Sequence, residues 1–305
     1  FLCNAGSLVG FLFPFIFTWI GISNIAPQGV VPDSVIYSFY IGAAILILCV
    51  IYTTVKVKEM PPAEYAEYHG ITEEEEKEKI NMVKLLVKAP KAFWTVGLVQ
   101  FFCWFAFMFM WTYTNGSVAA NVFDAPTVET AVNGVSKVML DTKSIQYQDA
   151  ADWVGVLFAV QAIGSVLWAV CIPLFKDRKL IYSLSLVLGG LGFISTYFVH
   201  NQYVLFISFL LIGCAWAAML ALPFTILTNA LSGGHMGTYL GLFNGTICIP
   251  QIVAASLGGS ILALFTPKGM LPPEINMLVM AGIMLIIGAV CVYLIKETKG
   301  EQTKA

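Results

Sequence analysis

Long unbroken runs of apolar residues constrain the fold of this chain more than any other feature. A helix needs roughly 20 apolar residues to cross the hydrocarbon core of a bilayer. Eight runs are of about this length, near residues 1–22, 34–55, 91–114, 152–175, 179–199, 203–227, 237–264 and 274–295. A transmembrane barrel would instead show short segments of alternating polarity. The sequence therefore predicts an all-α, polytopic membrane protein, a helical bundle with eight visible spans.

The composition supports this class and excludes others. Hydrophobic residues make up 58% of the 305 residues and charged residues only 11%, with a mean hydropathy of +0.82. A soluble domain carries about 25% charged residues. The formal net charge of −2 gives no reason to expect a nucleic-acid partner. The seven cysteines lie in or beside the apolar runs without a CxxC pair, so we predict neither a disulfide nor a zinc site.

Catalytic chemistry finds little support in the sequence. His69, His200 and His235 fall in three different connections, two on one side of the membrane and one on the other, so they form no metal pair. The acidic residues lie in connections or at span ends, so no carboxylate for a proton relay is expected at membrane depth. We therefore predict a protein that is not an enzyme and that has no cofactor and no metal site.

Basic residues are distributed unevenly between the connections, and this distribution predicts the orientation of the chain. Thirteen of the 16 lie in the connection 56–91, the turn 176–179 or the tail 296–305. The other three are Lys137, Lys143 and Lys268. Because positively charged connections stay in the cytoplasm, both ends of this chain are predicted to be cytoplasmic.

A long connection at residues 56–90 divides the chain into two parts. Two spans precede it in residues 1–55, and six follow it in residues 91–295, before a tail at 296–305. Six spans form one half of many transporters. We therefore predict the last two spans of an N-terminal half, a cytoplasmic linker, a complete C-terminal half and a cytoplasmic tail. The chain opens in an apolar run without a starting Met, which indicates a fragment of a longer protein.

The two long connections, 56–90 and 115–150, each lead to a structural prediction. In the linker, Thr72 and Glu75 form a capping box ahead of an amphipathic helix. We expect this helix to lie against the cytoplasmic ends of the spans through one apolar face, formed by Ile80, Val83 and Val87. The connection 115–150 is external, and the sequence leaves open whether it covers the outer mouth or is unstructured.

Amides and indoles form stripes on three predicted spans. In the first stripe they recur every three or four residues within an arc of roughly 80°, at Gln100, Trp104, Met108, Trp111 and Asn115. The other stripes hold Gln161, Ser165 and Trp168, and Asn244 and Gln251. Two interpretations stay open: amides that bond across helices with indoles in an interfacial belt, or a cavity for a polar, uncharged ligand. Sugars suit such a cavity, because hydroxyls need amides that both donate and accept.

The span at 237–264 contains further residues that are unusual in lipid. Gly237, Gly241 and Gly245 form a small-xxx-small ridge that predicts close packing of another helix. Pro250 is expected to interrupt the helical hydrogen bonds in the middle of the span. Asn244 and Gln251 are seven residues apart, so they share a face that we expect to point inward.

Three stretches resemble known transporter motifs. The turn KDRK at 176–179 is similar to the inner-loop signature of the major facilitator superfamily, with Asp177 and Arg178 in place of its D-R pair but without the flanking glycines. Residues 222–259 resemble the sucrose-transporter-like branch of the glycoside–cation symporters, in its motifs S-x-P-[FY], G-x-x-x-G-x-x-N and I-P-Q. The matching residues are Pro223, Phe224, Gly237, Gly241, Asn244, Ile249, Pro250 and Gln251.

The stretch WFAFMFMWTYTNG at 104–116 is similar to the segment W-F-[PA]-F…T-x-x-x-G of the same branch. That branch has an acidic residue beside the threonine, where this chain has Tyr113. The resemblance implies that the visible spans are the fifth to twelfth of a twelve-span carrier. It also implies that Asp177 and Arg178 belong to a cytoplasmic gate.

Together the stripes and the resemblance predict a monomeric secondary active transporter, multi-pass in an inner membrane. Its partners would be the lipid bilayer, a neutral sugar such as a disaccharide, and a coupling H⁺ or Na⁺. The predicted binding residues are Gln100, Trp104, Trp111, Asn115, Gln161, Asn244 and Gln251. The alternatives are a carrier of the same fold for a peptide, nucleoside or drug, and a non-transporting sensor.

Overall fold

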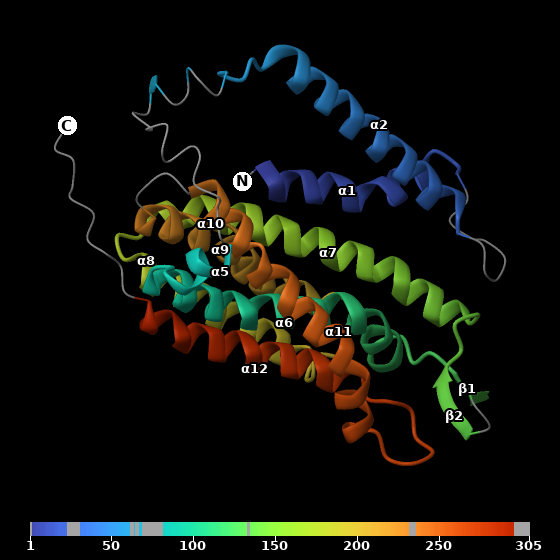
Figure 1. Cartoon of the computed structure of the whole chain (residues 1–305). Coiled ribbons are helices and arrows are strands. Elements are labelled where there is room, and N and C mark those ends of the chain that lie inside the picture. The colour runs from blue at the N-terminus through green and yellow to red at the C-terminus, as the bar shows by residue number, and fades with distance from the viewer. Residues whose placement is uncertain are drawn as a thin grey trace.

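The computed structural model describes residues 2–22, 31–61, 64, 67–68, 82–132, 135–231 and 236–295. Nearly all of its regular structure is helical (Figure 1). The longer helices are α1 (Leu2–Trp19), α2 (Asp33–Lys56), α6 (Lys91–Asn121), α7 (Ile145–Cys171), α8 (Arg178–Ser195), α9 (Leu205–Ala230), α11 (Gly245–Phe265) and α12 (Ile275–Cys291). The shorter elements are α5 (Met82–Val87), α10 (Met236–Phe243), the 3₁₀ turns η1 (Ile172–Leu174) and η2 (Val292–Leu294), and the strands β1 (Thr127–Val132) and β2 (Val135–Leu140).

Seven helical segments in the described part of the chain are long and apolar enough to cross a membrane. They are Asp33–Lys56, Lys91–Asn121, Ile145–Leu174, Arg178–Ser195, Leu205–Ala230, Gly237–Phe265 and Ile275–Leu294. The remaining predicted span, residues 1–22, corresponds to α1, which is helical over 18 residues. The prediction of an all-α polytopic bundle is confirmed.

Helix α6 is the central element of the bundle. It packs against α7, α9, α11 and α12, and buried residues follow it along almost its whole length. Helix α8 packs on α9 and α12, and α9 packs on α7, so the six spans from α6 to α12 form one packed unit. Helix α1 packs on α7, and α2 lies against α1 with nearly all of its side chains exposed (Figure 1).

Glycines set the closest approaches between helices. A Cβ on Gly213 of α9 would overlap the backbone carbonyl of Gln161 on α7. On the other side of the bundle, a Cβ on Gly282 of α12 would lie 2.6 Å from the carbonyl oxygen of Gly190 on α8. Glycine is therefore the residue that fits these helix pairs at their present spacing.

The predicted glycine ridge at 237–245 does not make such an approach. A Cβ on Gly237 or Gly241 would meet no described atom within 4 Å, and one on Gly245 would meet only Ile249 of its own helix, at 3.8 Å. Among the described residues α11 turns another face toward α6, with Pro250, Ala254 and Gly258 buried, so close packing at the ridge stays a prediction.

The span containing this ridge is interrupted, but not where the proline predicts. The break is at Asn244, between α10 and α11, and α11 continues as a helix through Pro250. A proline in a helix removes one hydrogen bond, and neighbouring groups can absorb that loss. Pro250 thus removes one helical hydrogen bond without ending α11, and the break in the span lies six residues earlier.

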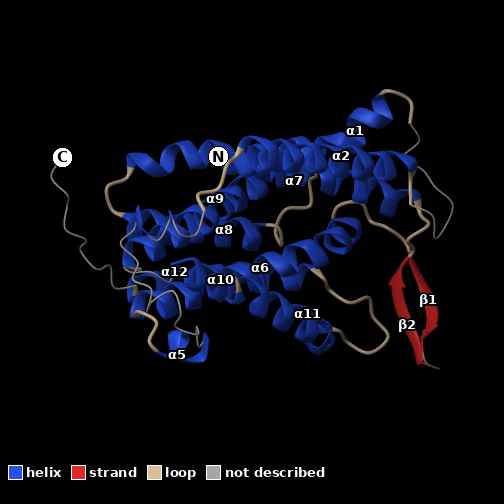
Figure 2. Cartoon of the chain, turned by 45° about the horizontal axis from the view of Figure 1, so that its top comes forward, coloured by secondary structure: helices blue, strands red, loops and turns tan. Residues whose placement is uncertain are grey.

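The connection 115–150 is largely ordered. Its first part extends α6 to Asn121, and its middle forms an antiparallel hairpin in which Thr127 pairs with Leu140. The hairpin stands away from the helices at one end of the bundle (Figures 1 and 2). We call this the hairpin end. The Oγ of Ser144 then accepts a hydrogen bond from the backbone N–H of Tyr147 at 3.3 Å and caps α7.

The linker helix is described only at α5, and the capping box at Thr72 and Glu75 lies outside the described residues. Val83 and Val87, predicted to face the bundle, are exposed. Leu85 and Leu86 are the partly buried residues of α5 instead. The Tyr239 hydroxyl of α10 donates to the Leu85 carbonyl at 3.2 Å, and this bond fixes which side of the short helix faces the bundle.

Candidate substrate-binding site

The first of the predicted polar residues, Gln100, lies in the first third of α6 and is completely buried. Its Nε2 donates to the Met219 carbonyl of α9 at 3.2 Å. Its Oε1 has no hydrogen-bond partner among the described residues. Gln100 therefore acts as a bond between helices and leaves one acceptor unused, which is rare for a buried amide.

One helical turn further along α6, Trp104 begins an aromatic cluster. Its ring centroid lies 5.8 Å from that of Trp216 on α9, in an edge-on arrangement. Trp111 meets the same ring from the next turns of α6, also at 5.8 Å, and Phe107 packs on it at 4.9 Å. Edge-on and tilted pairs at such distances are favourable. The Trp104 Nε1–H is buried without a partner among the described residues, so the cluster contains an unused donor.

Sequence reasoning missed Trp216, the centre of this cluster. The span 203–227 carries few polar residues, so no stripe marked it. The signal that could have found it is its position: Trp216 lies in the middle of the span, where an indole of the interfacial belt would not be placed.

Beside this cluster lies a cavity of about 190 Å³ between α1, α6, α7 and α9. Its lining combines an amide, a hydroxyl and indoles with apolar surface, and it contains no charged side chain: Ser7, Phe11, Met110, Trp111, Gln161, Ala162 and Trp216. Trp111 is 41% exposed, so its ring is open to this space as well as to the cluster. The structure thus brings together two predicted residues, Trp111 and Gln161, that are fifty positions apart in sequence.

The other predicted residues lie elsewhere. Asn115 is one turn beyond Trp111 toward the hairpin end, with a buried Oδ1 that has no partner among the described residues. Asn244 is exposed at the break between α10 and α11, and Gln251 is partly buried on α11. Neither contributes to the lining of the 190 Å³ cavity, because α11 packs on α6 away from α7.

A carboxylate lies closer to α6 than the sequence suggested. Glu274 occupies the N-cap position of α12 at the hairpin end, is partly buried, and packs against Gly116 of α6. Burial raises the pKa of its carboxyl to about 7. Sequence reasoning treated it as an ordinary acid at a span end. The preceding pair Pro272 and Pro273 was the available signal, since it leads the chain directly back into the bundle.

With this geometry established, comparison with known proteins gives the family. Residues 118–305, more than half of the chain, match the family model described as Major Facilitator Superfamily. The chain belongs to the major facilitator superfamily. The match runs from the last turn of α6 through α12. A search of curated proteins finds no match, so the narrower resemblance to sucrose transporters stays a prediction.

Membership of the major facilitator superfamily fixes the general activity. This protein is a multi-pass membrane transporter for a small molecule, and its helices are embedded in a lipid bilayer. An enzymatic role does not fit this family. Among the described residues, no three His, Cys, Asp or Glu side chains gather as metal ligands would.

In this major facilitator protein, the predicted gate residues lie at the start of α8. Asp177 Oδ1 accepts hydrogen bonds from the backbone N–H groups of Lys179 and Leu180, at 2.9 and 3.0 Å. Arg178 is exposed. Asp177 is thus an N-cap, a role that stabilises a helix by about 0.5–2 kcal/mol. A part in gating stays a prediction.

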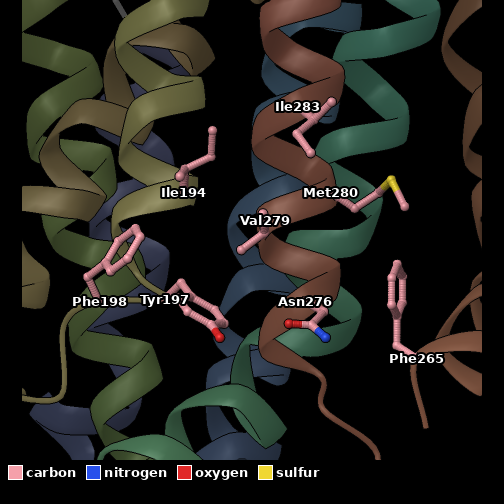
Figure 3. A pocket seen from close by; sticks show the side chains of 8 residues that line it. All are labelled: Ile194, Tyr197, Phe198, Phe265, Asn276, Val279, Met280 and Ile283. Carbon is pink, nitrogen blue, oxygen red and sulfur yellow. The ribbon is translucent and has the colours of Figure 1, made fainter.

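A larger pocket, of about 450 Å³, lies between α8, α12 and the end of α11 (Figure 3). Tyr197 and Asn276 are its polar lining residues, and the other six are apolar: Ile194, Phe198, Phe265, Val279, Met280 and Ile283. None of the predicted binding residues lines it. Its size exceeds that of the first cavity, but its surface offers little to a hydroxyl-rich ligand.

Proposed function

We propose that this protein is a secondary active transporter that moves a neutral sugar, a disaccharide or other glycoside, by alternating access. Coupling to H⁺ or another cation is part of the proposal. The observation that carries it is the lining of the 190 Å³ cavity, where the Gln161 amide and the Trp111 and Trp216 indoles meet without a charged group. Amides match hydroxyls as donors and acceptors, and aromatic faces suit the C–H faces of a sugar ring.

The lining also argues against other substrates. A peptide carries charged termini and would be bound through oppositely charged side chains. The aromatic wall is built on α6 and α9, two helices of the packed six-span unit, so it is a rigid surface. Gln100 and Trp104 support this wall from behind through Met219 and Trp216.

The cavity is smaller than the roughly 300–1,000 Å³ typical of ligand sites, at about 190 Å³. Ser7 and Phe11 of α1 close one side of it. We propose that α1 belongs to an N-terminal half and that α6 to α12 form the C-terminal half. In this arrangement a disaccharide gains room when α1 moves away from α7 as the halves rock.

The remaining predicted residues take positions along the proposed path. The distribution of basic residues supports a cytoplasmic location for both chain ends, which makes the hairpin end external. Asn115 would then lie on the external side of the cavity. Asn244 and Gln251 would face the second half from α11, while Asp177 and Arg178 would lie at the cytoplasmic side. A monomer in an inner membrane suffices for this scheme.

Transport by the full-length protein tests the proposal. The variants Gln161→Ala and Trp111→Ala should each lower disaccharide uptake at least tenfold, mainly through a higher KM. Two controls share their helices but not the cavity: Gln148→Ala on α7 and Trp94→Ala on α6, both exposed. Unchanged uptake of every sugar in the two cavity variants would remove this site.

The same assay separates the alternatives. Uptake of a labelled disaccharide is measured with unlabelled sugars, dipeptides, nucleosides and lipophilic drugs as competitors, under an imposed H⁺ or Na⁺ gradient. Competition by nucleosides or peptides alone would point to a carrier of the same fold with another substrate. Binding without uptake under any gradient would point to a sensor.

A further inference from the structure

Glu274 stands where three helices meet at the hairpin end of the bundle. It follows Pro272 and Pro273 and begins α12. A Cβ added to Gly116 of α6 would overlap the Glu274 carboxylate. A side chain at position 116 would therefore displace the carboxylate from its place on the surface of α6.

The groups that face this carboxylate do not neutralise it. From α6 comes the Tyr113 phenol, which lies close enough to interact electrostatically with Glu274. Gly258 of α11 lies against this phenol, since a Cβ there would lie 2.5 Å from the Tyr113 hydroxyl. The neighbouring α12 residues Ile275 and Leu278 are apolar and buried. Among the described residues, no Lys, Arg or His contributes to the electrostatic environment of Glu274.

An ionised carboxylate is costly in such a place. Burial removes water from the charge, and no cation among the described residues compensates for the loss. Protonation removes the charge and leaves a carboxylic acid, which can donate a hydrogen bond. The packing of α12 on α6 therefore favours the protonated form of Glu274.

We propose that Glu274 is a proton-binding site whose occupancy controls the packing of α12 against α6 at the hairpin end. With the proton bound, the two helices stay in contact. Without it, the carboxylate draws water, and the start of α12 separates from Gly116. The proposal does not depend on which solute the transporter carries.

The direction of the pH effect follows from linkage. The pKa of the Glu274 carboxyl is about 7 in the packed state, against 4.5 for an ordinary glutamate. The packed state therefore binds the proton more tightly. The extra stability that the bound proton gives to the packed state is complete below about pH 4.5, falls as the pH rises toward 7, and is lost above 7. Across this window the ratio of packed to separated states changes by up to about two orders of magnitude.

One test reads the proton directly on the unaltered protein. A hydrophobic carbodiimide modifies protonated carboxyl groups, and mass spectrometry gives the modified fraction at each residue between about pH 4 and 9. We expect modification of Glu274 to persist to about pH 7, whereas an ordinary glutamate with a pKa of 4.5 ceases to react well below that value. Loss of reactivity at Glu274 in the pH range of an ordinary glutamate would overturn the proposal.

A second test reads the packing. Hydrogen–deuterium exchange of residues 113–121 and 275–282, corrected for the intrinsic pH dependence, should show at least a tenfold loss of protection between about pH 5 and 8. Glu274→Gln, which mimics the protonated form, should keep its protection at both values. Asp149→Asn should behave as the unaltered protein does. Equal pH dependence in Glu274→Gln and the unaltered protein would contradict the proposal. Neither measurement requires transport, so a failure of the Glu274 proposal can be distinguished from a failure of the proposed sugar site.

Discussion

The Gln100 side chain completes a hydrogen bond that Pro223 leaves unmade. In α9 the Met219 carbonyl would accept from the N–H of residue 223, but proline has none. Gln100 Nε2 donates to that carbonyl instead, at 3.2 Å. A backbone carbonyl without a partner is costly at membrane depth. The amide is therefore explained by the proline of a neighbouring helix, and the two residues form one structural unit.

This relationship predicts a compensating pair of substitutions. Gln100→Leu should lower the free energy of unfolding by about 1–3 kcal/mol, since it leaves the Met219 carbonyl unsatisfied. Pro223→Ala restores the N–H, so the double variant should lose much less than the Gln100→Leu variant. The measurement is a double-mutant cycle from denaturant unfolding in detergent. Additive effects of the two substitutions would refute the coupling.

Two glycines on different helices should respond oppositely to alanine. Gly213→Ala places a methyl group on the Gln161 carbonyl and should destabilise the protein by about 1–3 kcal/mol. Gly241→Ala meets open space in the described structure and should stabilise helix α10 by about 0.5–1 kcal/mol. Thermal unfolding of both variants in the same detergent gives the comparison. A destabilised Gly241→Ala variant would restore the close packing predicted from its sequence pattern.

Tyr239→Phe should loosen the linker helix. Its hydroxyl bond to the Leu85 carbonyl joins α5 to α10, and losing such a bond costs about 0.5–1.5 kcal/mol. Amide exchange over residues 82–87 should speed up by roughly threefold to tenfold. Tyr197→Phe, which removes a hydroxyl at the other end of the bundle, is the control and should leave that segment unchanged. Identical exchange in both variants would mean that other contacts hold α5.

Asp177 allows capping to be separated from gating. Asparagine is as good an N-cap as aspartate, so Asp177→Asn should keep the stability of the protein. Asp177→Ala should lose about 0.5–2 kcal/mol. If Asp177 only caps α8, uptake by the Asn variant equals that of the unaltered protein once expression is matched. A strong loss of uptake in a stable Asn variant would instead support a charged gate.

Trp216 should matter more to the fold than an exposed indole. It is packed by Trp104, Trp111 and Phe107, so Trp216→Ala should cost about 3–5 kcal/mol. Trp94 is 52% exposed, and Trp94→Ala should change stability by only about 0.5 kcal/mol. Unfolding of the two variants provides the test. Similar losses in both would show that the aromatic cluster adds little to the packing.

The class of protein and the positions of its spans can be read from the sequence alone. Apolar runs of this length are stable in the hydrocarbon core of a bilayer. Their length and polarity are local properties, which can be read without knowing the fold. The motif at 176–179 likewise indicates the superfamily, because it is a short run of neighbouring residues. The stripe on α6 is visible for a similar reason, since helical periodicity is a property of a single helix.

The contacts that these residues make depend on the tertiary structure. The Gln100 amide donates a hydrogen bond to the Met219 carbonyl, and the Glu274 carboxylate packs against Gly116. Gln161 lines a cavity together with Trp111 and Trp216. The glycine ridge at 237–245 looked like a packing surface, yet α11 turns other residues to α6. Which face of a helix meets which partner depends on how several helices fill space together, and every face of a membrane helix is apolar enough to be a candidate. The role of a polar residue here is therefore set by its neighbours in space.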